Sequence, residues 1–244
     1  MNFNYLNINS ASRTSTSNSS TDFIISFDQT VKFKKLQLLS AVIPYTFYNV
    51  NSGNNVLRWT WNSILRTTTI TPGSYTANTL ASAINSAFQA INANLSVTFD
   101  SSTFKFTFTF SAAAPAVGVL NLSQSTMNDL IGYSPTASDT SSAGTQTSTQ
   151  ASQMNPINYL FINIDDCSRQ IMNAGSALSF SFYLPINVNT GEIIAFNTSI
   201  ESDQTVDLGG HDQAFSRVRI RITDDSGAVV DLNNNDWNML LKLN

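Results

Sequence analysis

Charged residues are scarce in this sequence. Asp, Glu, Lys and Arg together make up 11% of the 244 residues, whereas an average soluble domain has about 25%. The net charge is −4, so the chain as a whole has no excess of positive charge with which to bind nucleic acid, and we expect no specific nucleic-acid partner. Ser, Thr and Asn fill the polar positions instead. A surface of this kind is typical of proteins that pack against neighbours or work outside cells.

Cysteine and histidine are almost absent. The single cysteine, Cys167, excludes a disulfide within the chain and a cysteine-rich zinc site. The single histidine, His211, cannot supply the several imidazoles that a metal-dependent jelly-roll enzyme needs. A Ser-His-Asp triad would also depend on His211, and no Gly-x-Ser-x-Gly motif accompanies it. The sequence therefore predicts no enzymatic activity and no cofactor.

Two further absences limit the function. No run of about 18 apolar residues is present, so we expect no membrane span. The dipeptide Gly209-Gly210 lacks the Lys-Ser/Thr context of a phosphate-binding loop.

Adjacent carboxylates occur at Asp165-Asp166 and Asp224-Asp225, and the second pair precedes Ser-Gly, as in a turn. A glycosidase pair of carboxylates and a calcium loop stay open as alternatives.

Strand patterns dominate what the sequence does contain. Apolar residues alternate with polar ones in TDFIISF (21–27), and a denser apolar run ends at Ile43-Pro44, where proline favours a break. VLRWTW (56–61) and LRTTTI (65–70) are typical of a hairpin across Asn62-Ser63. About eleven strands without βαβ alternation predict an antiparallel sandwich. The further strands are expected in SVTFD, FKFTFTF, INYLFINI, SALSFSFYLP, GEIIAFN, SRVRIRITD, AVVDLN and WNMLLKLN.

One amphipathic helix is expected, at about 76–92. Thr76 can cap its N-terminus, and apolar residues recur at helical spacing along one face. These residues are Leu80, Ile84, Phe88 and Ile91. In FKFTFTF, four phenylalanines fall on one side of a strand and are expected to be buried. They are Phe104, Phe106, Phe108 and Phe110.

Basic residues gather on two predicted strands. In SRVRIRITD, Arg217, Arg219 and Arg221 project from one face, about 6.8 Å apart, while apolar residues project from the other. We call these three residues the arginine ribbon. It is either a solvated, locally paired face or a contact stripe for carboxylates of a neighbouring subunit, with the loop 201–207 or Asp165-Asp166 as their source. Lys32 and Lys34, followed by Lys35, mark a second exposed face.

Two segments have too few apolar residues to fold alone. Residues 1–20 are expected to form a polar N-terminal arm, and the Ser/Thr-rich segment 134–155 is expected to be a flexible loop. Residues 21–244 are then predicted to form a single domain that contains this loop.

Several stretches, in order, resemble the penton proteins of virophages, Polinton-like viruses and large DNA viruses. They are FKKLQLLSAVIPYTFYNVNSGNN, ITPGSYTANTLASAINSAF, LIGY, INYLFINID and SRVRIRITDDSGAVVDLNNNDWNMLLKL. The resemblance covers about 31–244, although 134–155 has no counterpart in it and Asn235 stands where glycine is common.

This resemblance implies an all-β fold, a single jelly-roll sandwich with one inserted helix. It implies a structural capsid protein of the virion, made in the host cell, that closes five-fold vertices of an icosahedral capsid as a homopentamer. The implied partners are further copies of the chain, a double jelly-roll major capsid protein and other minor capsid proteins. In such a pentamer, the arginine ribbon with Lys32 and Lys34 is expected at the subunit interface.

A second function stays open. A jelly-roll carbohydrate- or receptor-binding module, such as a lectin or a spike, could use Trp59 and Trp61, which share one face of their strand, or loop carboxylates with calcium. The two tryptophans would then stack on sugar rings, unless they pack in the core. No residue pattern decides between these two roles.

Overall fold

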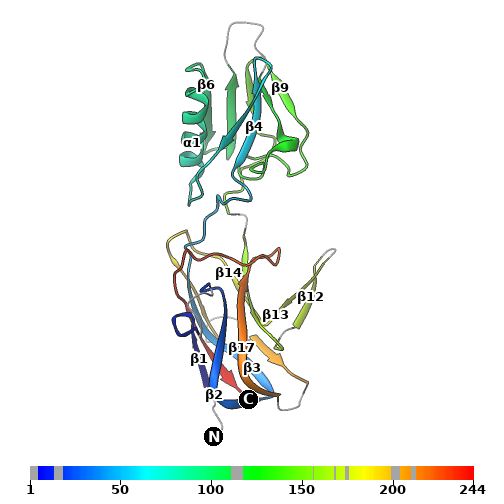
Figure 1. Cartoon of the computed structure of the whole chain (residues 1–244). Helices are drawn as coiled ribbons and strands as arrows, with labels where there is room; N and C mark the ends of the chain where they lie inside the picture. The colour runs from blue at the N-terminus through cyan, green and yellow to red at the C-terminus, as the bar shows by residue number, and fades with distance from the viewer. Residues whose placement is uncertain are drawn as a thin grey trace. The chain divides into compact units, whose positions relative to one another are not determined.

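The hydrophobic side chains of this protein form two separate cores, as the computed structural model shows (Figure 1). Residues 5–13, 19–110, 118–155, 157–167, 169–173, 176–198, 204–209 and 213–244 are described. Met1–Phe47 and Ile157–Asn244 make up unit 1, and Tyr48–Pro156 make up unit 2. The sequence predicted one domain over 21–244, whereas the chain leaves unit 1 after Phe47 and returns at Ile157.

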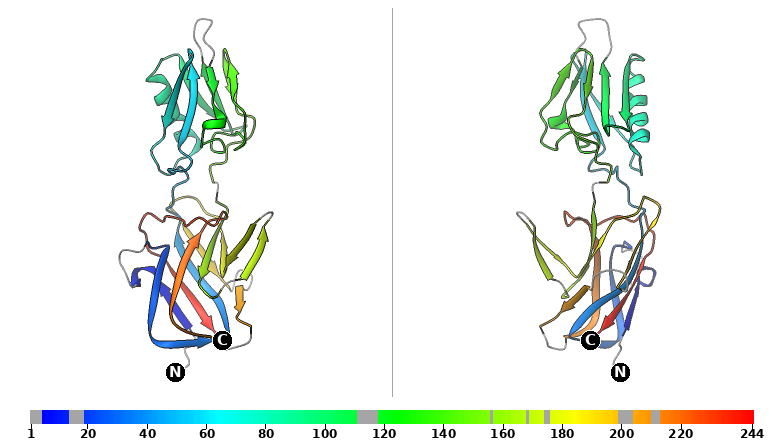
Figure 2. Two further views of the ribbon diagram at one scale, coloured as in Figure 1. Left: turned by 45° about the vertical axis from the view of Figure 1, so that its right-hand side comes forward. Right: turned by 180° about the vertical axis from the view of Figure 1, so that it is seen from behind.

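Unit 1 is a sandwich of two antiparallel sheets, visible in the lower parts of Figures 1 and 2. The first sheet, sheet A, has the order β1 (Tyr5–Asn9), β18 (Asn238–Leu243), β3 (Lys35–Pro44) and β15 (Ile193–Asn197), and β16 (Gln204–Asp207) also pairs with β3. The second sheet, sheet B, has the order β14 (Phe182–Pro185), β11 (Tyr159–Ile164), β17 (Gln213–Thr223) and β2 (Asp22–Phe33).

The core of unit 1 lies between these sheets because apolar residues occupy alternate positions in most of the strands. Ile43 of β3, Ile162 of β11 and Ile220 of β17 are completely buried. A separate hairpin, β12 (Arg169–Asn173) with β13 (Ser176–Phe180), projects from the sandwich (Figure 2). The run SALSFSFYLP was predicted as one strand, but it is interrupted at Ser181.

Unit 2 contains two smaller sheets and the only described α-helix. One sheet has the order β5 (Ile64–Thr69), β4 (Val56–Trp61), β8 (Gly118–Leu120) and β9 (Thr140–Ser142). The other has the order β10 (Thr145–Thr147), β7 (Lys105–Phe110) and β6 (Leu95–Asp100). The hairpin between β4 and β5 turns at Asn62 and Ser63, both with positive φ, as the sequence predicted for this position.

Helix α1 (Ala77–Gln89) begins at the predicted cap. Thr76 and Thr79 exchange the two hydrogen bonds of a capping box. Leu80, Ile84 and Phe88 are completely buried, which places the apolar face of the helix in the core of unit 2. Ile91 lies beyond the helix and is 42% exposed, so its predicted burial is wrong.

Phe104 is also exposed, against the expectation for the four phenylalanines of β7. Phe106, Phe108 and Phe110 are completely buried, whereas Phe104 is 58% exposed. Phe104 has φ 56° and lies in the turn that precedes β7, so it is outside the period-two pattern. The pattern therefore identified the buried face but extended it by one residue too many.

The two predicted flexible segments contain strands. Within 134–155, β9 pairs with β8 and β10 pairs with β7, and Gln146 and Ser148 are buried. Within 1–20, β1 pairs with β18, and Ile8 is completely buried in the core of unit 1. Parts of both segments therefore pair as strands with other parts of the chain, which composition alone does not reveal.

Phe88 tests the packing of α1. Its ring lies 4.1 Å from the ring of Trp59, between centroids, and close to Phe108 and Phe110. Phe88→Ala is expected to lower the free energy of unfolding of unit 2 by about 3–5 kcal/mol, because it leaves a cavity. Urea unfolding followed by tryptophan fluorescence measures this change. Ile91→Ala is the control and should change stability by less than about 0.5 kcal/mol; equal effects of the two substitutions would contradict this packing.

Candidate functional site

The described residues do not form a catalytic or metal-binding cluster. Among the described ranges, no three His, Cys, Asp or Glu side chains lie close enough to hold a metal ion. His211 lies outside the described residues. Cys167 is completely buried, and burial, together with the charge of Asp166, raises the pKa of its thiol to about 12. This thiol is therefore neutral at physiological pH and unsuited to nucleophilic chemistry.

The paired carboxylates have structural roles. Asp224 accepts hydrogen bonds from the backbone N–H groups of Ser226 and Ala228 and from the Ser226 hydroxyl, which is the chemistry of a tight turn. Asp165 forms an ion pair with Arg221. Neither arrangement resembles a pair of carboxylates that faces a substrate.

The tryptophans of β4 lie in the core. Trp59 is 1% exposed and its Nε1 donates a hydrogen bond to Thr68 Oγ1 at 3.0 Å. Trp61 is 7% exposed. Neither ring can stack on a sugar, so the residues on which a carbohydrate-binding role depended do not reach the surface.

The arginine ribbon lies on the outer face of sheet B, as predicted, but two of its members have partners in the same chain. Arg219 makes a two-pronged contact with Asp22, with both N···O distances at 2.7 Å. Arg221 contacts Asp165 at 2.9 Å. Arg217 is exposed and has no ion-pair partner among the described residues.

These ion pairs bear on one part of the sequence interpretation. The sequence left open whether local carboxylates or those of another subunit pair with the ribbon. Asp22 and Asp165 of the same chain pair with Arg219 and Arg221, whereas Arg217 forms no ion pair among the described residues. The side chain of Asp22 comes from β2, which pairs with β17 next to the ribbon. The hydrogen bond and charge of Asp22 also raise the pKa of Arg219, so this guanidinium stays charged.

The lysines of the second basic face lie at one end of unit 1. Lys32 and Lys34 are exposed, and within the described ranges neither forms an ion pair. Lys35 contacts Asp207 at 3.0 Å. The expectation that Lys32, Lys34 and the arginine ribbon lie at a subunit interface stays a prediction.

The outer face of sheet A has a different character. Ten outward-facing residues of β1, β18, β3 and β15 include no charged side chain, and we call them the neutral face. Ile193 and Val42 are 56% and 36% exposed on this face, although both are apolar. The neutral face consists of Asn7, Asn9, Ser40, Val42, Pro44, Ile193, Ala195, Asn197, Asn238 and Leu240.

Aromatic rings gather on the outer face of sheet B, beside the arginine ribbon. Tyr159 and Phe161 of β11 and Tyr183 of β14 face outward, because their neighbours along each strand are in the core. Phe180 joins them, with its ring centroid 4.8 Å from that of Phe161 and 6.1 Å from that of Tyr183. We call Tyr159, Phe161, Phe180 and Tyr183 the aromatic face.

A polar kink places Phe180 in this cluster. Ser181 is completely buried, accepts a hydrogen bond from the N–H of Ile164 and donates one to the carbonyl of Cys167. The Ser181 hydroxyl therefore takes the place of a backbone carbonyl as the acceptor for the N–H of Ile164, at the point where β13 ends and β14 begins. The chain therefore changes direction at Ser181, and Phe180, which is only 2% exposed, packs beneath the rings of Phe161 and Tyr183.

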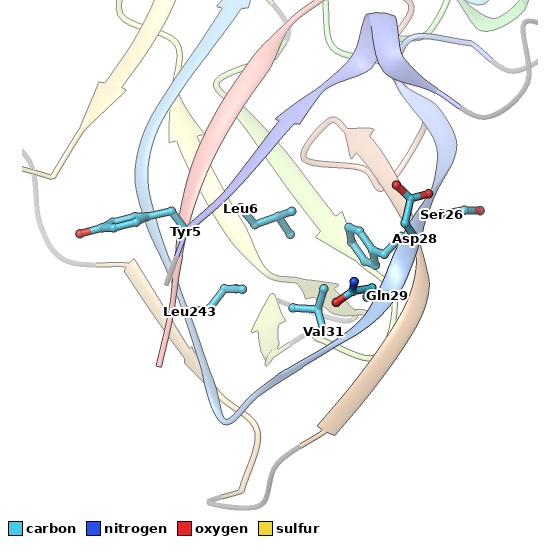
Figure 3. A pocket seen from close by; sticks show the side chains of 8 residues that line it. Tyr5, Leu6, Ser26, Asp28, Gln29, Val31 and Leu243 are labelled. Carbon is cyan, nitrogen blue, oxygen red and sulfur yellow. The ribbon is translucent and has the colours of Figure 1, made fainter. Parts of the chain in front are cut away.

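The two lateral sides of the sandwich also differ. Between β14 and β16, the buried Gln204 amide donates to the carbonyl of Tyr183 and accepts from its N–H, which joins the two sheets. Between β1 and β2 there is an opening of about 350 Å³ (Figure 3). Leu6, Val31 and Leu243 point into it, whereas Asp28 points away.

A bulge in β2 forms one wall of this opening. Ser26 pairs with Arg217 and Val31 pairs with Phe215, so the four residues 27–30 face the single residue Ser216. The extra length bends the strand away from its neighbour. The opening is mostly apolar and contains neither a nucleophile with a base nor a set of metal ligands.

Sequence reasoning missed the neutral face, the aromatic face and the opening. The sequence does contain a pattern that indicates the neutral face and the aromatic face. In NYLFINI, apolar residues occupy both alternating sets, and the same holds for EIIAFN. A strand that is apolar on both sides indicates an outer face that is covered. The opening depends on a bulge and on strand order, which the sequence does not display.

Comparison with known proteins adds three findings. The family model described as "Family of unknown function (DUF5901)" matches residues 4–228. The chain belongs to this family. No curated protein matches the sequence.

The fold is similar to that of a solved virophage protein. The crystal structure of the mavirus penton protein superimposes with a TM-score of 0.53 at 12% sequence identity, over 97% of each chain. The predicted all-β antiparallel fold with one helix is thereby confirmed as the fold of a penton protein. Within the described part of the chain, no helix has the length and apolar character that crossing a membrane requires.

The thiol of Cys167 gives a direct test of the described burial. Native protein at pH 8 is expected to react with a disulfide reagent at least ~100-fold more slowly than unfolded protein, because the buried thiol stays protonated. Absorbance after reagent addition, with and without 6 M guanidinium, measures the two rates. Equal rates would contradict the burial of Cys167.

The same thiol affects stability at high pH. Its pKa is raised from 9.0 to about 12 in the folded state, so the unfolded state loses this proton first. The free energy of unfolding should therefore fall as pH rises from 9 toward 12. Cys167→Ser, unfolded in parallel, should lack this part of the pH dependence.

Proposed function

We propose that this chain is the penton subunit of a viral capsid. The observation that carries the proposal is the shared fold with the mavirus penton protein over 97% of both chains. In this role the chain forms a homopentamer that closes the five-fold vertices of an icosahedral virion. Its further partners are a double jelly-roll major capsid protein and other minor capsid proteins.

The surface chemistry of the described residues supports a structural role. Asp224 stabilises a turn, Asp165 forms an ion pair, the thiol of Cys167 is buried, and the tryptophans of β4 are in the core. What remains exposed on unit 1 are broad faces of sheet, which suit contact with other proteins. No observation favours the carbohydrate-binding alternative now that Trp59 and Trp61 are known to be buried.

Sedimentation of the purified chain tests the proposed homopentamer. A dilution series is expected to show a species of five times the 26.6 kDa of one chain, in equilibrium with monomer. A cyclic arrangement is closed, so the largest species should stay at five chains as concentration rises. A monomer at every concentration would overturn the homopentamer, and masses that grow without limit would overturn the closed ring.

A further inference from the structure

We propose that subunits join head to tail, with the aromatic face of one chain packed against the neutral face of the next. This inference rests on the proposed homopentamer and specifies which surfaces form its repeated contact. The partner is a second copy of this chain. The argument uses the positions of the two faces, their exposed residues and their charge.

The two faces lie on opposite sides of unit 1. The neutral face is part of the outside of sheet A, the aromatic face is part of the outside of sheet B, and the core of unit 1 separates them. A head-to-tail contact joins two different surfaces of identical subunits, whereas a two-fold contact joins one surface to itself. A sandwich with a different uncharged surface on each side meets the first requirement.

Both faces expose apolar side chains that water does not favour. Tyr159 is 42% exposed and Ile193 is 56% exposed. Interface cores are enriched in aromatic residues and depleted of charged ones. The two faces together contain aromatic rings on one side and aliphatic residues with uncharged polar ones on the other, and neither face contains a charged residue.

Charge also favours contact between these two faces. The neutral face has no charged residue, and the outward charges of the same sheet, Lys35, Asp207 and Lys242, lie toward the opposite end of β3 and β18. The outward residues of β11 and β14 are uncharged as well. The named residues of the two faces therefore bring no charge into the contact, which avoids the cost of desolvating an ion.

Polar groups of the two faces complement each other. Tyr159 and Tyr183 carry hydroxyl groups at their outer ends, and the neutral face offers the amide groups of Asn7, Asn9 and Asn238. An aromatic ring that packs on an aliphatic residue and donates its hydroxyl to an amide is a common interface contact. The arginine ribbon, of which Arg219 and Arg221 are paired within the chain, then lies at the rim.

Two charge-insertion variants test the contact. Ile193→Lys blocks the neutral face, and Tyr159→Lys blocks the aromatic face. Both residues are exposed, so both variants should fold, which far-UV spectra and thermal unfolding will verify. An unpaired lysine in a desolvated contact should weaken each junction by at least ~30-fold, and each variant alone should sediment mainly as monomer.

Mixing the two variants identifies the geometry of the contact. Each mixed pair retains one intact aromatic face and one intact neutral face, so the mixture is expected to form a dimer of one I193K and one Y159K chain, and nothing larger. Native mass spectrometry distinguishes this dimer from either homodimer. Homodimers of Y159K alone would show that the neutral face contacts itself and would overturn the proposal.

The remaining outcomes separate this inference from the proposed function. A pentameric wild type with pentameric I193K and Y159K overturns the inference and leaves the penton role standing. A wild type that is monomeric throughout overturns the homopentamer and this contact together. Arg219→Ala with Arg221→Ala is the matched control, and it should stay pentameric; its dissociation, with I193K unaffected, would place the contact at the arginine ribbon instead.

If either lysine variant fails to fold, Ile193→Ser and Tyr159→Ser replace it. These changes introduce no charge and are expected to raise the dissociation constant of each junction by ~10-fold. An unchanged dissociation constant for both serine variants overturns the inference.

Discussion

The period-two geometry of the strands governs most of what unit 1 presents to its surroundings. Each strand must direct one set of side chains into the core, and the sheets hold that direction because a slip of one residue would reverse it. Leu160 and Ile162 are buried, so Tyr159 and Phe161 are fixed on the outside. Core packing therefore determines which side chains face outward, and this orientation does not depend on what the outer faces contact.

The sequence predicted the parts of the fold that depend on local pattern. The helix cap at Thr76, the hairpin turn at Asn62-Ser63 and the end of β3 at Pro44 each follow from a few neighbouring residues. The insertion of unit 2 was not predictable in this way. Strands of both units have the same alternation, and only long-range pairing, such as that of β3 with β15 and β18, determines which strands share a core.

The candidate site, too, could be predicted only where it depends on local pattern. Three arginines at alternate positions correctly indicated an exposed face of β17, but the partners of Arg219 and Arg221 come from residues 197 and 56 positions away in the chain. The exposed apolar residues were visible in the sequence as strands with two apolar sides. Their division between two opposite outer faces required the order of strands in each sheet.

The hydrogen bond between Asn49 and the carbonyl of Met154 has a consequence for how the chain folds. It joins the two ends of unit 2, and the strand pairs of unit 2 all lie between these ends. Unit 1, in contrast, needs strands from both sides of the insertion. The entropy lost on closing a loop grows with its length, so an unfolded insertion opposes the meeting of β3 and β15. Once unit 2 has folded and its two ends are held together by this hydrogen bond, the insertion acts as a short connection between the two parts of unit 1. We therefore expect unit 2 to fold first and unit 1 to complete its sheets afterwards.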